Sequence, residues 1–414
     1  MVYIDIDSPA GRRIPIAIPE FTINSVQGSS SRAAKRAKLD IMDALSGDLD
    51  FSGHFDVIEK TAYIEKSEPA GGTNFSNWRL ISAELLIKGS ISVVGEDLTV
   101  EIRLFDVVKE KQLTGTRFMG KIQNPRIIAH RFADEIIKEL TGALGIFSTR
   151  IMFIANRSDG KEIFMSDYDG RNLKQITHNG SINLSPQWSP DGRKVLYTSY
   201  KNGRPALYVR NISNSKERKV SDKPGINIAG RWGPRGDKIA LTLSINKNPE
   251  LYTLDLNTNI YTRLTRNGGI DTSPTWSPDG RRLAYVSDIA GNPHIYMINS
   301  TGGKPKRLTY EGKYNTTPSW SPNGKWITFS RLRNGKFSIW VMRPDGMSQK
   351  RLTYEGNNEN PSWSPDSRYI IFSTTDRKFR TSLYMIRADG TGLRRVPSGL
   401  GTEKSPSWSP FFKY

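Results

Sequence analysis

The feature that most constrains this chain is a tryptophan that recurs about every 44 residues. Successive copies are 44, 44, 44, 43 and 45 residues apart, and a proline stands two positions after each of them. One copy reads SPTWSPDG, and a comparable turn dipeptide follows in five of the six copies. A period in the forties with several short strands predicts the blades of a β-propeller. The six tryptophans are Trp188, Trp232, Trp276, Trp320, Trp363 and Trp408.

Each repeat has room for four strands. In the copy around Trp276, the segments RLAYVSD (282–288), HIYMINS (294–300) and PKRLTYEG (305–312) follow the tryptophan. Their alternating apolar residues, bounded by Gly, Asn and Pro, indicate half-buried strands. We therefore expect the tryptophan on the innermost strand, where its large ring fills the wedge between adjacent blades.

The two ends of the repeat region complement each other. Residues 150–156, 162–167 and 173–178 have the pattern of a second, third and fourth strand with no first strand ahead of them. The terminal SPSWSP (405–410) is a first strand with nothing after it. Joining them predicts a six-bladed ring that is closed by strands from both ends of the propeller domain and has no free edge strand.

The first 149 residues lack the repeat and alternate strands with helices. The last predicted helix begins at Pro125, with Asn124 as its cap, and carries apolar residues four positions apart. We expect a mixed α/β domain over residues 1–145 and an all-β propeller over residues 146–414. The predicted strands are 14–21, 55–60, 85–93, 98–107 and 114–122, and the predicted helices are 31–45, 77–84 and 125–140.

Composition restricts the chemistry. The chain has no cysteine, which excludes disulfides and thiolate chemistry. Residues 1–149 carry 18 basic and 20 acidic residues, whereas residues 150–414 carry 42 and 21, so the basic excess lies on the repeats. Such a field attracts an acidic partner or solubilises the propeller exterior, and no nucleic-acid motif accompanies it. We expect no nucleic-acid partner. The chain begins with MVYIDI, and we expect that a signal peptide has been removed ahead of it.

The chain resembles the TolB family of Gram-negative periplasmic proteins over nearly its full length. The resemblance rests on VYIDIDSPAGRRIPIAIPEF, SGHFDVIEK, the junction ELTGALGIFSTRIMFIAN, the six repeats and the terminal PSWSPFF. It implies a non-enzymatic, monomeric adaptor of the Tol–Pal envelope system in the periplasm. Such an adaptor binds the lipoprotein Pal, the protein TolA and other envelope proteins, and is peripheral to the outer membrane through them. Its system supports outer-membrane integrity and constriction during cell division.

A polar or acidic residue stands five positions before every repeat tryptophan. In a propeller these loops connect one blade to the next, so we expect the six side chains near the mouth of the central channel. Asn and Asp are also ordinary loop residues. In the TolB family this loop set forms part of the Pal-binding face, which adds Ile226, Ala229, Thr272 and Ser273; some relatives have a histidine where this chain has Ile226. The six residues are Asn183, Asn227, Asp271, Asn315, Asn358 and Glu403.

No catalytic or cofactor site is expected. The four histidines, His54, His130, His178 and His294, lack metal-ligand spacing, and no G-x-S-x-G or Gly-rich phosphate loop is present. Asp279 and Asp366 recur with the turn and are interpreted as turn caps. A channel cation such as calcium would find only Asp271 and Glu403 as acidic ligands. The alternative function is a propeller hydrolase or lyase acting on an anionic cell-envelope polymer.

The N-terminal segment alternates apolar and polar residues from Val2 through Tyr3, Ile4, Asp5 and Ile6 to Asp7. This pattern predicts an extended strand that pairs with a sheet edge, either within the first domain or in a partner. The resemblance to the TolB family implies that the segment is held against the protein or released to bind TolA.

Overall fold

The structure is a computed structural model that describes residues 12–28, 31–64 and 72–412. The chain forms two compact units, Met1–Ser148 and Thr149–Tyr414, and each is described by itself. The predicted strand of Val2–Asp7 lies outside the described residues.

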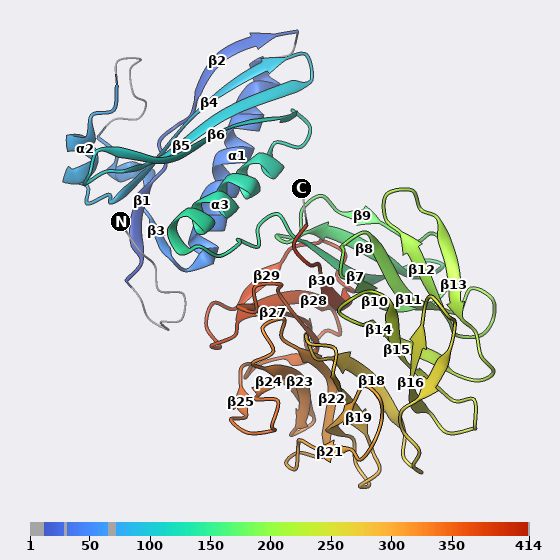
Figure 1. Cartoon of the computed structure of the whole chain (residues 1–414). Helices are drawn as coiled ribbons and strands as arrows, with labels where there is room; N and C mark the ends of the chain where they lie inside the picture. The colour runs from blue at the N-terminus through green and yellow to red at the C-terminus, as the bar shows by residue number, and fades with distance from the viewer. Residues whose placement is uncertain (1–11, 29–30, 65–71, 413–414) are drawn as a thin grey trace. The chain divides into compact units, whose positions relative to one another are not determined.

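The first unit contains a six-stranded mixed sheet (Figure 1). One side of the sheet is the antiparallel run β4–β5–β6, which ends in the edge strand β6, while β1 is parallel to both β3 and β4. β1 and β2 both pair with β4, one after the other. Ala17 of β1 lies opposite Leu86, and Thr22 of β2 lies opposite Ser90, further along β4. The strands are β1 (Ile14–Ala17), β2 (Thr22–Gln27), β3 (Phe55–Val57), β4 (Leu85–Val94), β5 (Asp97–Asp106) and β6 (Lys111–Lys121).

Two long helices pack against each other and against this sheet (Figure 1). They are α1 (Ser31–Ser52) and α3 (Arg126–Thr141); a shorter helix, α2 (Phe75–Leu80), and a one-turn 3₁₀ helix (Lys60–Ala62) complete the unit. A buried polar pair joins the two long helices, with His130 Nδ1 lying 2.7 Å from Asp48 Oδ2. Burying these groups as a pair avoids the cost of burying either one alone.

Several local predictions in the first unit are wrong in their bounds. The helix expected over 77–84 is α2 (Phe75–Leu80), and the strand expected over 55–60 ends at Val57. The strand expected over 14–21 ends at Ala17, because the chain leaves the sheet around Pro19, and a separate strand, β2, begins at Thr22. The helix expected to end at Leu45 continues to Ser52, since Leu45 and Leu49 are both fully buried on the same face. The helix expected to begin at Pro125 with Asn124 as its cap begins at Arg126. Its N-cap is therefore Pro125, which makes no side-chain capping bond.

The second unit is a six-bladed propeller with four antiparallel strands in each blade. We number the blades around the ring from the one that contains both ends of the domain. Blade 1 is β30 (Lys404–Trp408), β7 (Arg150–Arg157), β8 (Gly160–Asp167) and β9 (Lys174–Gln175), and blade 2 is β10 (Asn183–Trp188), β11 (Lys194–Ser199), β12 (Ala206–Asn211) and β13 (Glu217–Ser221). Blade 3 is β14 (Asn227–Trp232), β15 (Lys238–Leu243), β16 (Glu250–Asp255) and β17 (Tyr261–Arg263), and blade 4 is β18 (Asp271–Trp276), β19 (Arg282–Ser287), β20 (His294–Asn299) and β21 (Lys306–Arg307). Blade 5 is β22 (Tyr314–Trp320), β23 (Ile327–Arg333), β24 (Lys336–Met342) and β25 (Lys350–Arg351), and blade 6 is β26 (Asn357–Trp363), β27 (Tyr369–Thr375), β28 (Thr381–Arg387) and β29 (Arg394–Val396).

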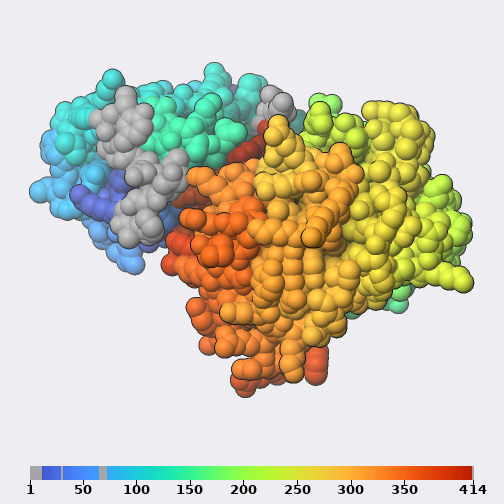
Figure 2. Space-filling view, turned by 60° about the horizontal axis from the view of Figure 1, so that its bottom comes forward, coloured from blue at the N-terminus to red at the C-terminus, as the bar shows by residue number. Residues whose placement is uncertain are grey.

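The predicted ring closure is confirmed. β30, from the end of the domain, pairs antiparallel with β7, from its beginning, with Trp408 opposite Ile151. Figure 1 shows the dark red β30 beside the green β7. Consecutive blades lie side by side around the ring, so the colour of the propeller surface changes in order from green through yellow to orange (Figure 2).

The repeat tryptophans link neighbouring blades, as the sequence predicts. Hydrophobic clusters lie between adjacent blades; one of them joins Met152 and Ile163 of blade 1 to Trp188 and Val195 of blade 2. In blades 2, 4 and 6 the indole nitrogen also donates a hydrogen bond to the inner strand of the preceding blade. The acceptors are the carbonyl oxygens of Ser407 for Trp188, Arg231 for Trp276 and Ser319 for Trp363, at 3.1, 3.2 and 3.0 Å.

We predict that Trp408→Ala lowers the stability of the propeller by about 3–5 kcal/mol, the usual loss for a deleted buried aromatic ring. Trp408 is 5% exposed, and its indole nitrogen donates to Thr149 Oγ1 at 2.8 Å, so the substitution opens a cavity where the ring closes. Urea unfolding followed by circular dichroism measures the effect. Trp326→Ala, at a half-buried tryptophan outside the repeat set, is the matched control and loses less. Equal unfolding midpoints for the two variants would contradict the role of Trp408.

Candidate functional site

Two sets of loops meet at one end of the propeller. One set connects each blade to the next, and the other connects the second strand of a blade to its third. Backbone contacts join the sets, because Ser244 N donates to Ile226 O at 3.2 Å and Asn315 N donates to Pro293 O at 2.8 Å. We call the surface formed by these loops the loop face.

The six residues five positions before the tryptophans lie at the start of the inner strands, but they do not face the channel mouth. The expectation that these side chains are accessible to a partner is wrong, because each of the six residues is at most 2% exposed. A side chain this buried offers no surface to a partner. Each one instead forms hydrogen bonds within its own loop. The residues are Asn183, Asn227, Asp271, Asn315, Asn358 and Glu403.

Asn227 illustrates how these side chains hold the loops. Its Oδ1 accepts hydrogen bonds from Ser221 Oγ at 2.8 Å and from Lys223 N at 2.9 Å. Its Nδ2 donates to Lys223 O at 2.6 Å, which closes the turn between blades 2 and 3. Asn183 does the same one blade earlier, since its Nδ2 donates to Lys161 O at 2.9 Å and to Asn179 Oδ1 at 3.0 Å. An amide side chain suits this position because it both donates and accepts.

The two acidic members of the set do not share a site. Asp271 begins the inner strand of blade 4 and Glu403 precedes that of blade 1, so they lie three blades apart on the ring. Asp271 Oδ2 accepts from Asn267 Nδ2 at 2.7 Å, and burial raises the pKa of the Asp271 carboxyl. Glu403 accepts a hydrogen bond from Ser398 Oγ in its own loop. This arrangement gives no support to a channel cation such as calcium held by both carboxylates.

Asn315 belongs to a larger buried network between blades 4 and 5. Arg331 Nε donates to Asn315 Oδ1 at 2.8 Å, and His294 Nδ1 lies 3.2 Å from Asn315 Nδ2 and 3.2 Å from Thr309 Oγ1. Burial lowers the pKa of His294, and the positive charges of Arg307 and Arg331 lower it further. This histidine is therefore neutral and structural near neutral pH.

The loop face also exposes a set of apolar side chains, which were not expected from the sequence. They come from residues six positions before the tryptophans, where Ile182 is 43% exposed, Ile270 48% and Tyr314 40%, while Ile226 is half-buried. Two exposed isoleucines of the second-to-third-strand loops adjoin them. Ser244, the residue before Ile245, bonds to Ile226, and the backbone of Ile289 packs against Gly269. We call this set the apolar arc: Ile182, Ile226, Ile245, Ile270, Ile289 and Tyr314.

The inner strands of all six blades enclose a central cavity of about 500 Å³. Every inner strand has a β-bulge, and the residue three positions before each tryptophan has a left-handed backbone with φ between +49° and +57°. Non-glycine residues adopt this conformation rarely. Because it recurs at the same position in all six blades, the bulge is a regular feature of the fold. The six residues, all small or polar and all lining the cavity, are Ser185, Ala229, Ser273, Thr317, Asn360 and Ser405.

The remaining expected site residues divide into three groups. Ala229 and Ser273 line the central cavity, and Thr272 is half-buried on the inner strand of blade 4. Ile226 lies in the apolar arc on the loop between blades 2 and 3. Val2, Tyr3, Ile4, Asp5, Ile6 and Asp7 lie outside the described residues.

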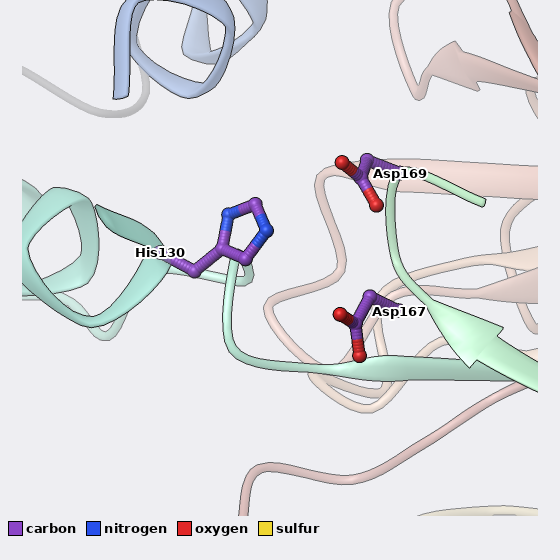
Figure 3. Close-up of side chains that lie close together, drawn as sticks. All are labelled: His130, Asp167 and Asp169. Atoms are coloured by element: carbon purple, nitrogen blue, oxygen red, sulfur yellow. The ribbon is translucent and has the colours of Figure 1, made fainter. Parts of the chain in front are cut away.

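The histidines occupy separate places in the two units. His54 follows α1, His130 lies on α3, His178 is exposed on a propeller loop, and His294 belongs to the buried network. Figure 3 shows His130 projecting from its helix, and Asp167 and Asp169 at the end of β8 and in the turn that follows. These three residues belong to different units and are not assigned to one site.

The interpretation of the aspartates as turn caps is confirmed. Asp279 Oδ1 accepts hydrogen bonds from Ser277 Oγ at 2.5 Å and from Arg281 N at 3.0 Å. Asp366 Oδ1 does the same with Ser364 Oγ and Arg368 N. Among the described residues, no helix has the length and apolar composition needed to cross a membrane.

We predict that Asn227→Ala lowers the stability of the propeller by about 1–3 kcal/mol, because Ser221 Oγ and Lys223 N lose their buried acceptor. Hydrogen exchange at Lys223 N is expected to accelerate in the same variant. Asn246→Ala, at an exposed asparagine of the same face, is the matched control and leaves both quantities unchanged. Unchanged exchange at Lys223 in Asn227→Ala would show that the buried amide does not hold the loop.

Comparison with known proteins agrees with this architecture. A family profile for the TolB amino-terminal domain matches residues 2–113, and a profile for the TolB beta propeller domain matches residues 137–412. The crystal structure of TolB from Acinetobacter baumannii is 27% identical, has a TM-score of 0.84, and is covered over 100% of its length by 99% of this chain.

Two relatives are described as Tol-Pal system protein TolB. The protein from Desulfosudis oleivorans is 40% identical over 218 residues, which are 52% of this chain and 49% of that protein. The protein from Syntrophus aciditrophicus is 38% identical over 227 residues, 53% of this chain and 49% of that protein. The chain thus spans about half the length of the curated relatives it matches. With both domain profiles matched in order and most of the chain covered, this protein belongs to the TolB family.

Proposed function

We propose that the protein is a periplasmic adaptor of the Tol–Pal system that binds partners without catalysing a reaction. The names of its relatives and the order of its two domains support this role. The partners we propose are the lipoprotein Pal at the propeller and TolA at the N-terminal segment. Through them the protein would support outer-membrane integrity and constriction during division.

The apolar arc is the observation that supports a protein partner on the loop face. Four of its residues, Ile182, Ile245, Ile270 and Ile289, are isoleucines between 39% and 49% exposed on adjacent blades. Single exposed apolar residues are ordinary, whereas a contiguous set rimmed by polar residues is typical of interaction surfaces. The buried asparagines contribute indirectly, because they fix the loops that carry the arc.

Charge supports an acidic partner at this face. The loops that carry the arc also carry exposed basic residues, among them Lys223, Lys247, Arg266 and Lys313. Charges at the rim of an interface mainly accelerate association and choose among partners, while the desolvated apolar centre supplies most of the affinity. Binding is therefore expected to weaken moderately with added salt.

The alternative function, a hydrolase or lyase acting on an anionic envelope polymer, has less support. The basic propeller surface is the feature that favours it. The histidines lie in separate places, and His294 is held in a buried network. A binding role accounts for the apolar arc, which an anionic polymer would not require.

We predict that Ile270→Ser combined with Ile289→Ser weakens binding of the periplasmic domain of Pal at least tenfold. Removing two exposed isoleucines that the partner would bury costs more than about 1.4 kcal/mol, which corresponds to a tenfold change in affinity. Isothermal titration calorimetry of the full chain measures the change. Ile260→Ser, at a 61% exposed isoleucine in the loop between the third and fourth strands of blade 3, is the matched control and retains the parent affinity. Equal losses in both variants would contradict the arc as the binding surface.

We predict that deleting residues 2–7 abolishes binding of TolA while Pal still binds. The alternation of Val2, Ile4 and Ile6 with polar residues suits strand addition to a partner sheet, in which main-chain bonds supply the affinity. Pull-down with the periplasmic domain of TolA measures the loss, and Pal binding by the same variant reports that the propeller is intact. Undiminished TolA binding by the shortened chain would overturn this assignment.

A further inference from the structure

Blade 3 departs from the repeat where its inner strand lines the central cavity. In the other five blades, proline stands two positions before the tryptophan and serine directly after it, whereas blade 3 has Gly230 and Gly233. The residue directly before Trp232 is Arg231. The corresponding residues of the other blades are uncharged and also line the cavity: Gln187, Thr275, Ser319, Ser362 and Ser407.

Arg231 brings an unpaired charge into the channel. It is the single charged residue among the described residues that line the cavity. Its Nη1 is buried and has no hydrogen-bond partner, and its guanidinium forms no ion pair with any described residue. The adjacent Trp232 Nε1 is also buried without an acceptor, although the equivalent nitrogens of Trp188, Trp276 and Trp363 all have one. This blade therefore presents two buried donors that lack acceptors.

Arg231 is half-buried as a residue, but its guanidinium is buried at Nη1, and a buried charge without a partner is costly because it loses its hydration and gains nothing in return. Burial lowers the pKa of Arg231 from 12.5 to about 10, so the group remains positive at neutral pH. Neighbouring acids do not neutralise it. Glu359, on the inner strand of blade 6, does not line the cavity, forms no ion pair with Arg231, and is attracted to Lys404 of blade 1. A bound anion would supply the missing charge.

The groups around Arg231 suit an oxyanion. A guanidinium offers planar, forked donors that match the oxygens of carboxylate and phosphate. The hydroxyls of Thr275, Ser319, Ser362 and Ser407 stand at the same register on other inner strands and are further donors. The cavity of about 500 Å³ is large enough for such an ion together with water. We propose that the central channel of the propeller binds one oxyanion, a phosphate or a carboxylate, with Arg231 as its principal ligand.

Titration of the full chain with inorganic phosphate, and separately with acetate, tests this site. Tryptophan fluorescence in a chloride buffer of constant ionic strength follows binding, because Trp232 adjoins Arg231. We expect a saturable change in fluorescence in the parent and at least tenfold weaker binding in Arg231→Gln. Glutamine is chosen because blade 2 has it at the equivalent position, Gln187. Arg231→Lys keeps the charge but loses the fork, so intermediate binding is expected. Arg218→Gln removes an equal charge from the exposed β13 and binds like the parent.

A response to phosphate alone identifies free phosphate as the source of the ligand, and a response to acetate identifies a carboxylate group. No saturable response in the parent, or an equal response in Arg231→Gln, overturns the proposal.

Thermal unfolding gives a second readout. In chloride buffer we expect Arg231→Gln to melt at a higher temperature than the parent, since it removes an unpaired buried charge, and the ligand should raise only the melting temperature of proteins that bind it. A lower melting temperature for Arg231→Gln in chloride, with no effect specific to the ligand, would also overturn the proposal.

Discussion

The pairing of β30 with β7 is the interaction on which the rest of the propeller depends. It joins the last strand of the chain to the first strand of the domain, with Trp408 opposite Ile151. Closure gives blade 1 its inner strand, so all six blades have four strands, and the outer edges that remain are the short fourth strands such as β9 and β21. Closure also places the six inner strands in equivalent positions around one axis, so a feature that recurs in the repeat recurs around the channel. The bulge three residues before each tryptophan is such a feature.

Most of the fold could be predicted from the sequence, because the tryptophan period fixes the number of blades and the incomplete repeats at the two ends fix the closure. The errors lie at element ends and in side-chain direction. α1 continues past Leu45 because the buried face continues to Leu49, and the strand expected to end at Phe21 ends at Ala17, before Pro19. Asn227 and its equivalents were expected in the inter-blade loops, whereas five of the six lie at the start of inner strands and Glu403 directly precedes one. The sequence does not show whether an asparagine in a loop faces solvent or bonds its own backbone, and here it bonds the backbone.

Two departures from sixfold symmetry, the apolar arc and Arg231, support the functional proposals. Six positions before the tryptophan, blades 2 to 5 have Ile182, Ile226, Ile270 and Tyr314, whereas blades 6 and 1 have the polar Asn357 and Thr402. The apolar arc therefore occupies one side of the ring, which suits a single partner that docks in one orientation. Both this pattern and the substitution of Arg231 are visible in the aligned repeats.

The most direct test of the loop face as a docking surface is hydrogen exchange of the full chain with and without the periplasmic domain of Pal. We expect slower exchange in the loops that carry the apolar arc, among them residues 222–226, 264–270 and 288–293. We expect no change in the loops between the third and fourth strands, residues 212–216 and 256–260, which lie away from the loop face. Protection confined to the second set of loops, or no protection in either set at saturating Pal, would contradict the loop face as the docking surface.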